Sequence, residues 1–155
     1  MAKLPAIVCD SSVLIRLRKG DALSCLAALF DRVLIPEAVY REATDPAVKE
    51  RIEKDDFEVH EVRNVLFKVL GRGEQEVISL AVLENIPFVA LDDLDAIKKA
   101  DHHGLEVVSS FKLLALAKQA KVFPAVKPIL DRMKEAGEGI KDNEYRNTLQ
   151  KSGEW

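Results

Sequence analysis

Short apolar runs alternate with helical segments along this chain of 155 residues, and this alternation limits the folds that it can adopt. Helical periodicity separates five runs that we predict to be strands, namely residues 6–10, 32–36, 57–62, 87–93 and 105–110. Strands separated by helices indicate βαβ units. We therefore predict an α/β fold with three layers, α/β/α, around a central and mostly parallel sheet, followed by C-terminal helices.

Length and composition favour one domain. A chain of this length with 48% hydrophobic residues can bury one well-packed core but is short for two. We predict a single domain over residues 1–155, with residues 111–155 as a helical C-terminal extension of it. No apolar run approaches the roughly 20 residues that span a bilayer, so we expect a soluble, cytoplasmic protein with no membrane partner. Residues 21–30 are predicted to be a helix with Asp21 as its N-cap.

The net charge of −3 argues against a protein that simply coats nucleic acid. It leaves open an enzyme whose acidic pocket holds cations while local basic residues contact phosphate, because net charge averages over patches of opposite sign. Basic residues near the acidic positions could be such contacts or could simply solvate a face; they are Arg16, Arg18, Lys19, Arg72, Lys98 and Lys99. Cys9 and Cys25 lack the spacing of metal ligands and are expected to be buried thiols.

Three carboxylates stand where predicted strands end. Asp10 closes the strand "AIVCD", and Asp92 and Asp93 close "PFVALDD". In a parallel sheet the carboxyl ends of the strands share one edge, where ligands bind. We therefore expect these three acids to project from the same edge.

Two further acids stand on predicted helices. Glu42 shares a helix face with Val39 and Ala38, so we expect it on the inward side. Glu74 opens a helix directly after "GRG". It could join a functional cluster, or it could only interact with the helix dipole, which is worth about 0.3–1 kcal/mol.

A cluster of four or five carboxylates opposes folding unless a cation neutralises it, since like charges raise one another's pKa. Carboxylate oxygens suit Mg²⁺ or Mn²⁺, which bridge to substrate phosphate. The chemistry that this pattern favours is metal-assisted phosphodiester hydrolysis, in which the metal lowers the pKa of a bound water.

Four motifs in fixed order resemble the PIN domain, a fold of metal-dependent ribonucleases that includes many toxins of toxin–antitoxin modules. They are "VCDSSVLI", "IPEAVYREA", "GRGEQEVISLA" and "FVALDDLDAIKKADHHGLEVV". The chain looks most like a branch in which the last acid is doubled to Asp-Asp and a helical tail follows, so the similarity covers nearly the whole chain.

The resemblance implies a set of site residues. The catalytic acids and metal ligands would be Asp10, Glu42, Glu74 and Asp92, with Asp93 as an additional ligand and Ser12 as the hydroxyl that orients Asp10 or a metal-bound water. The branch often carries an Arg after Asp-Asp and a Gly-Thr pair after the next strand. This chain has Leu94 and Ile97, and then Ser109-Ser110, where Ser110 could supply the missing hydroxyl.

By resemblance, the protein would be an endoribonuclease that depends on Mg²⁺ or Mn²⁺ and hydrolyses RNA, as the toxin of a toxin–antitoxin module. The implied partners are an RNA substrate, a small antitoxin protein and a second copy in a homodimer. The alternative is a catalytically inactive PIN-like module that binds RNA or protein. A phosphotransfer domain fits less well, because a receiver needs its acidic pair after the first strand and a haloacid-type phosphatase needs an Asp where Ser12 stands.

Overall fold

The computed structural model describes residues 2–63 and 72–155, and these contain a five-stranded, fully parallel sheet. The strands are β1 (Leu4–Cys9), β2 (Phe30–Pro36), β3 (Glu58–His60), β4 (Phe88–Ala90) and β5 (Glu106–Val107), in the spatial order β3-β2-β1-β4-β5. Each strand overlaps one of the five predicted runs. The structure confirms the predicted α/β fold with a central parallel sheet.

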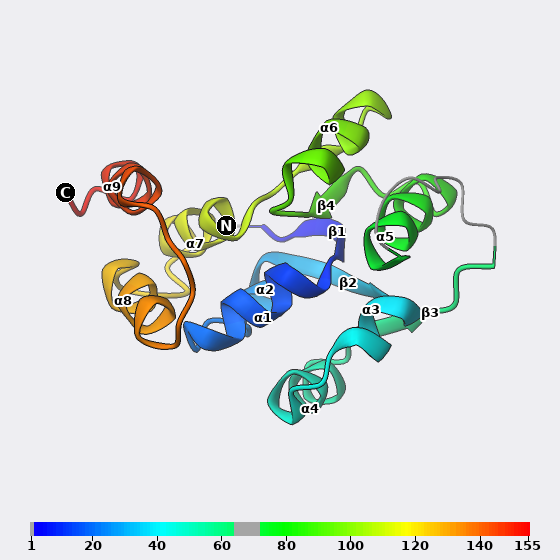
Figure 1. Cartoon of the computed structure of the whole chain (residues 1–155), viewed down its shortest axis with the longest axis horizontal. Coiled ribbons are helices and arrows are strands. Elements are labelled where there is room, and N and C mark those ends of the chain that lie inside the picture. Colours follow the sequence, from blue (N-terminus) through cyan, green and yellow to red (C-terminus); the bar gives the residue numbers. More distant parts are fainter. Residues whose placement is uncertain (1, 64–71) are drawn as a thin grey trace.

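Helices cover both faces of the sheet. They are α1 (Ser11–Lys19), α2 (Cys25–Leu29), α3 (Glu37–Glu42), α4 (Pro46–Lys54), α5 (Arg72–Leu83), α6 (Leu94–His102), α7 (Ser110–Gln119), α8 (Lys127–Glu135) and α9 (Asp142–Lys151). Figure 1 shows α5 on one side of the strands and α1, α2 and α7 on the other. The strands between these layers are largely buried, and β1 ends in four consecutive buried residues. No helix in the described part of the chain is long and apolar enough to cross a membrane.

The segment 21–30 differs from its prediction. Helix α2 is only five residues long and Ser24, not Asp21, occupies its N-cap position. Asp21 has a φ of 54°. The end of α1 explains this, because the N–H groups of Asp21 and Ala22 donate back to the carbonyls of Arg18 and Leu17, at 2.9 and 2.8 Å. Residues 21 and 22 therefore form the C-terminal turn of α1, at the place where a second helix was expected to begin.

The order of the strands reverses direction between β1 and β4. From β1 the chain moves outward to β2 and β3, and it then crosses back to β4, on the other side of β1, and to β5. Cys9 is paired with Ala90, and the N–H of Asp10 donates to the carbonyl of Ala90 at 3.1 Å. In open α/β sheets, ligands bind beyond the carboxyl ends of the strands at such a switch point.

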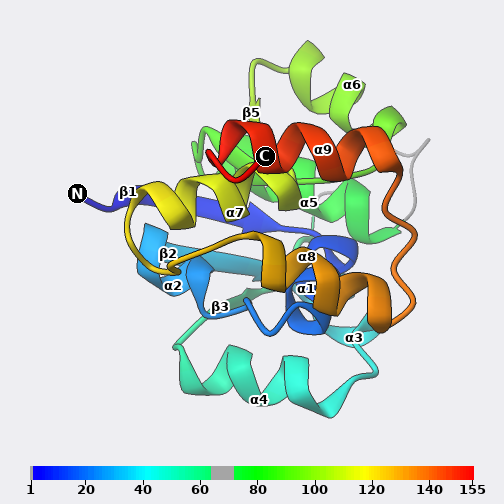
Figure 2. The ribbon, with the colours of Figure 1, turned by 90° about the vertical axis from the view of Figure 1, so that its left-hand side faces the viewer.

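The C-terminal helices pack outside α1 and α2, where Figure 2 shows α7, α8 and α9 in front of the sheet. Helix α8 contacts α1, and α7 contacts α2 and α1. Gly20, at the C-terminal end of α1, lies directly against two side chains of α8. A Cβ atom at this position would lie 2.7 Å from Cγ2 of Ile129 and 2.9 Å from Cε of Met133. A glycine is required there because these α8 side chains occupy the space that any other side chain would fill.

Gly20→Ala is therefore expected to destabilise the protein by about 1–3 kcal/mol, the usual cost of overpacking a core. Ile129 is branched at Cβ and cannot turn aside as easily as the end of Met133. Urea unfolding measures the change. Gly139→Ala is the matched control, because an added Cβ there meets nothing within 4 Å. Equal stability of the two variants would contradict tight docking of α8 on α1.

Candidate functional site

One pocket at the carboxyl edge of the sheet gathers every acid that the sequence suggested. It has a volume of about 540 Å³. Its lining comprises Asp10, Ser11, Ser12, Arg16, Glu42, Gly73, Glu74, Asp92 and Asp93. These residues come from the ends of β1 and β4 and from α1, α3 and α5. The pocket lies at the switch point between β1 and β4, where the topology favours ligand binding.

Asp10 is the most buried of these acids. It directly follows β1, occupies the N-cap position of α1 and is only 4% exposed. The hydroxyl of Ser12 donates to its Oδ2 atom at 3.1 Å. Burial, opposed by hydrogen bonds from Ser11 and Ser12 and reinforced by the charges of Glu42 and Asp92, raises the pKa of Asp10 to about 6. The ionised form of Asp10 is therefore unfavourable in the folded protein, and a bound cation would stabilise it.

Glu42 reaches the pocket from the last residue of α3. The expectation that it faces inward is wrong, because the residue is exposed. Its carboxylate is nevertheless held on both oxygens: Oε2 accepts from Ser11 Oγ at 2.9 Å and Oε1 accepts from the N–H of Gly73 at 3.1 Å. A Cβ atom on residue 73 would lie 2.7 Å from Oε1. A side chain at residue 73 would therefore displace the Glu42 carboxylate from this position.

Glu74 stands in the first turn of α5 and is half-buried. Burial raises the pKa of Glu74 to about 7, and the charges of Asp10, Asp93, Glu42 and Asp95 add to this effect. Of the two sequence-based interpretations, the geometry favours membership of the acidic cluster over a purely local role at the helix end.

Asp92 is held more tightly than the other acids of the pocket. Its Oδ1 atom accepts from the N–H of Ser110 at 2.9 Å, and its Oδ2 atom accepts from the Ser110 hydroxyl and from Nη1 of Arg16, the latter at 3.1 Å. Ser110 thus supplies a hydroxyl at the place suggested by the sequence. Asp93 has a different task, since its Oδ2 atom caps α6 by accepting from the N–H of Ala96 at 3.0 Å.

The sequence alone does not place Arg16 or Glu138 at the centre of this site. Arg16 was only one of six basic residues near the acids, yet its side chain lines the pocket. Its Nε atom donates to Oε1 of Glu138 at 3.0 Å. Glu138 lies between α8 and α9, far along the chain from every motif. No local pattern marks it, because its position depends on how α8 docks against α1.

The donor chemistry of the pocket fits a hard divalent cation. Carboxylate oxygens are the ligands of Mg²⁺ and Mn²⁺. Burial, together with the charges of neighbouring carboxylates, raises the pKa values of Asp10 and Glu74. The side chains are not arranged for coordination, however. Within residues 2–63 and 72–155, no three acidic, histidine or cysteine side chains converge closely enough to hold an ion. Ion binding would require carboxylates such as Asp92 to exchange their present hydrogen bonds for the metal.

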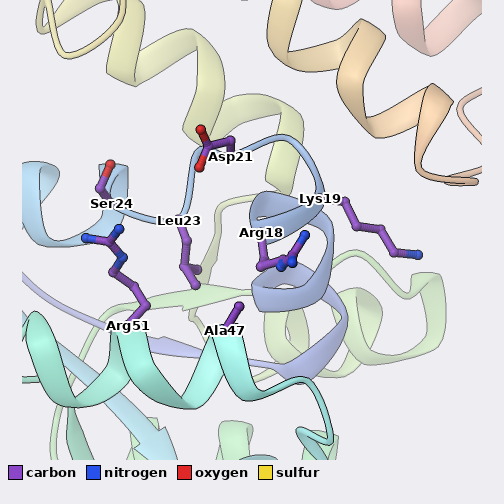
Figure 3. Close-up of a pocket in the computed structure, with 7 residues that line it drawn as sticks. All are labelled: Arg18, Lys19, Asp21, Leu23, Ser24, Ala47 and Arg51. Atoms are coloured by element: carbon purple, nitrogen blue, oxygen red, sulfur yellow. The ribbon is translucent and has the colours of Figure 1, made fainter.

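A second pocket, of about 270 Å³, lies at the other end of α1 (Figure 3). Arg18, Lys19 and Arg51 contribute positive charge to its lining. Each of these cations already has a carboxylate partner: Arg18 pairs with Asp45, Lys19 with Glu138 and Arg51 with Asp55. The pocket therefore does not present three free positive charges to an anion. Of the other basic residues considered, Lys98 is exposed, Lys99 has an interaction partner, and the side chain of Arg72 lies outside the described part of the structure.

The comparison with protein families finds one family, DUF3368, described as a PIN domain, which matches residues 6–154. This span includes all the residues that line the acidic pocket and the five strands, apart from the first two residues of β1. No curated protein matches the chain.

The raised pKa of Asp10 predicts a pH-dependent effect of Asp10→Asn on the metal-free protein. A carboxyl whose pKa is raised on folding stabilises fully only below its unfolded value of 3.8, and this contribution is lost as the pH rises through about 6. At pH 8 the neutral Asn should therefore increase stability, by on the order of 2 kcal/mol. The gain should vanish below pH 4. Urea unfolding in EDTA at both pH values measures it.

Asp131→Asn is the matched control for that experiment. A hydrogen bond from Lys127 lowers the pKa of Asp131, a partly exposed residue of α8. Because its pKa is lowered, the ionised form of Asp131 stabilises the folded protein, and Asp131→Asn should lose stability at pH 8. A loss of stability at pH 8 in both variants would show that Asp10 is not strained by its neighbours.

Proposed function

Because the chain belongs to the PIN-domain family, a family of nucleases, we propose that it is an endoribonuclease that depends on Mg²⁺ or Mn²⁺ and hydrolyses phosphodiester bonds in RNA. The observation that carries the proposal is the single pocket at the β1/β4 switch point, lined by Asp10, Glu42, Glu74 and Asp92. Such a concentration of acids is unfavourable for binding any anion unless cations accompany it.

The residues of the pocket have distinct roles in this proposal. Asp10, Glu42, Glu74 and Asp92 would hold the ion, and Asp93, which already caps α6, would contribute from the rim. A bound divalent ion would supply Lewis-acid chemistry, which activates water and offsets charge on the phosphate. Ser12 orients Asp10 through its hydrogen bond, and Ser11 and Gly73 hold Glu42 at the pocket wall.

We further propose, on the family relationship, that the protein acts as the toxin of a toxin–antitoxin module. A small antitoxin and a homodimeric state belong to this proposal. The acidic pocket would then be the surface that such a partner blocks.

Asp10→Asn is expected to lower the rate of Mn²⁺-dependent RNA cleavage by more than about 100-fold. Loss even of a residue that only supports a metal ligand costs 10–100-fold in metalloenzymes, and Asp10 is the most buried acid of the cluster. Cleavage of a mixed-sequence, end-labelled RNA, resolved on a denaturing gel, measures the rate. The products should carry 5′-phosphate and 3′-hydroxyl ends.

Asp131→Asn again serves as the control, since Asp131 lies on α8 outside the lining of the acidic pocket. It should cleave as the wild type does, and EDTA should stop both. Full activity of Asp10→Asn, or wild-type cleavage that persists in EDTA, would contradict the proposed site. RNA binding without cleavage by the wild type would instead favour an inactive binding module of the same fold.

A further inference from the structure

We infer that Arg16 binds the phosphate of the RNA substrate in the acidic pocket, and that Glu138, from the C-terminal extension, is the residue that positions it. This inference rests on the proposed function, because it assigns a substrate contact to the same pocket. Among the described side chains that line the pocket, Arg16 is the only cation. An RNA phosphate that enters a ring of carboxylates needs a positive partner, and Arg is the side chain best suited to phosphate oxygens.

The guanidinium of Arg16 is held on three sides. Its Nη1 atom donates to Asp92 at 3.1 Å and its Nε atom to Glu138 at 3.0 Å. One face of the group lies over the ring of Phe111, with Cζ 5.2 Å from the ring centroid. The side chain is 20% exposed. Its orientation is thus set before a substrate arrives, which lowers the entropic cost of binding one.

The same contacts leave donors available. A guanidinium carries five N–H groups, and the two hydrogen bonds to Asp92 and Glu138 use one on Nη1 and one on Nε. The other N–H groups donate to no residue in the described part of the chain. They belong to a partly exposed side chain on the pocket wall. Two N–H groups of one guanidinium can bind a phosphate in the bidentate way.

Glu138 holds Arg16 from the side of the C-terminal extension. Its two oxygens accept from Arg16 Nε and from Lys19 Nζ, each at 3.0 Å. Arg16 and Lys19 lie three residues apart on one face of α1, so a single carboxylate can reach both. Burial works against the charge of Glu138, but hydrogen bonds from Lys19 and Arg16 outweigh it and hold the pKa of this carboxyl below its usual range. Glu138 is therefore ionised at neutral pH.

The C-terminal extension contributes to the pocket through these contacts. Phe111 belongs to α7, and Glu138 follows the turn that ends α8. The N–H of Glu138 donates to the carbonyl of Met133, which also packs against Gly20 of α1. The docking of α8 on α1 thus sets the position of Glu138, and Glu138 in turn sets that of Arg16. An ion pair with a purely structural role would stabilise this docking but would not contact RNA.

RNA binding distinguishes the two roles. The parent is the full wild-type chain, and each variant is made in it. Binding of a labelled, mixed-sequence single-stranded RNA is measured by fluorescence anisotropy at several salt concentrations, with Ca²⁺, another cation that binds carboxylate oxygens, in place of Mn²⁺ to limit cleavage. Arg16→Met should raise Kd about tenfold or more, since it removes a charged bidentate contact. It should also reduce the salt slope by about 0.7, the value for one phosphate contact to a single strand.

Two further variants keep the test independent of folding. Arg16→Lys retains the charge, so it should keep the salt slope while Kd rises less than in Arg16→Met. Glu138→Gln should raise Kd by a smaller factor, because Arg16 remains but is less firmly held. Arg32→Met is the matched control: Arg32 is also paired with a carboxylate, Glu58, but stands near the start of β2, away from the pocket.

Unchanged Kd and salt slope in both Arg16 variants, with normal RNA binding by the parent and by Arg32→Met, would overturn the role of Arg16 alone. That result would make the ion pair structural, even if the variants unfold at lower temperature. Failure of the parent and of Arg32→Met to bind RNA would overturn the proposed function and this inference together. The two failures are therefore distinguishable in one set of measurements.

Discussion

The pairing of β1 with β4 determines where the acids of the pocket lie. Cys9 is paired with Ala90, so the two strands end side by side and the residues that follow them share one edge. Asp10 and Asp92 are among these residues. The chain reverses its direction across the sheet at this point, and the edge beyond such a switch point is where ligands bind in open α/β sheets. Helices α3 and α5 then add Glu42 and Glu74 around that space.

This placement concentrates negative charge, and the surrounding residues limit its cost. Asp92 receives hydrogen bonds from Ser110 and Arg16, and Glu42 receives them from Ser11 and Gly73. Asp10 and Glu74 are compensated less, and their raised pKa values follow from burial and like charge. Hydrogen-bond donors of the protein itself thus offset part of the negative charge of the pocket. A metal ion would have to compete with some of them, which links metal affinity to the position of Arg16.

Strand-end acids could be predicted from the sequence because their position depends on local patterns. Apolar runs located β1 and β4, and parallel topology placed Asp10 and Asp92 at one edge. Predictions were poorer where tertiary contacts decide. Glu42 was expected to face inward, but α3 ends at that residue and leaves it exposed. Glu138 was not identified, since its contact with Arg16 exists only after α8 docks on α1.

Thermal unfolding of the wild type and of Asp10→Asn, with and without Mn²⁺, tests most directly whether the acidic pocket is a metal site, and it needs no knowledge of the RNA target. At about 100 times the dissociation constant, Mn²⁺ should stabilise the wild type by roughly 2.7 kcal/mol and the variant much less. An equal shift in both proteins, or no shift in the wild type, would contradict the metal site.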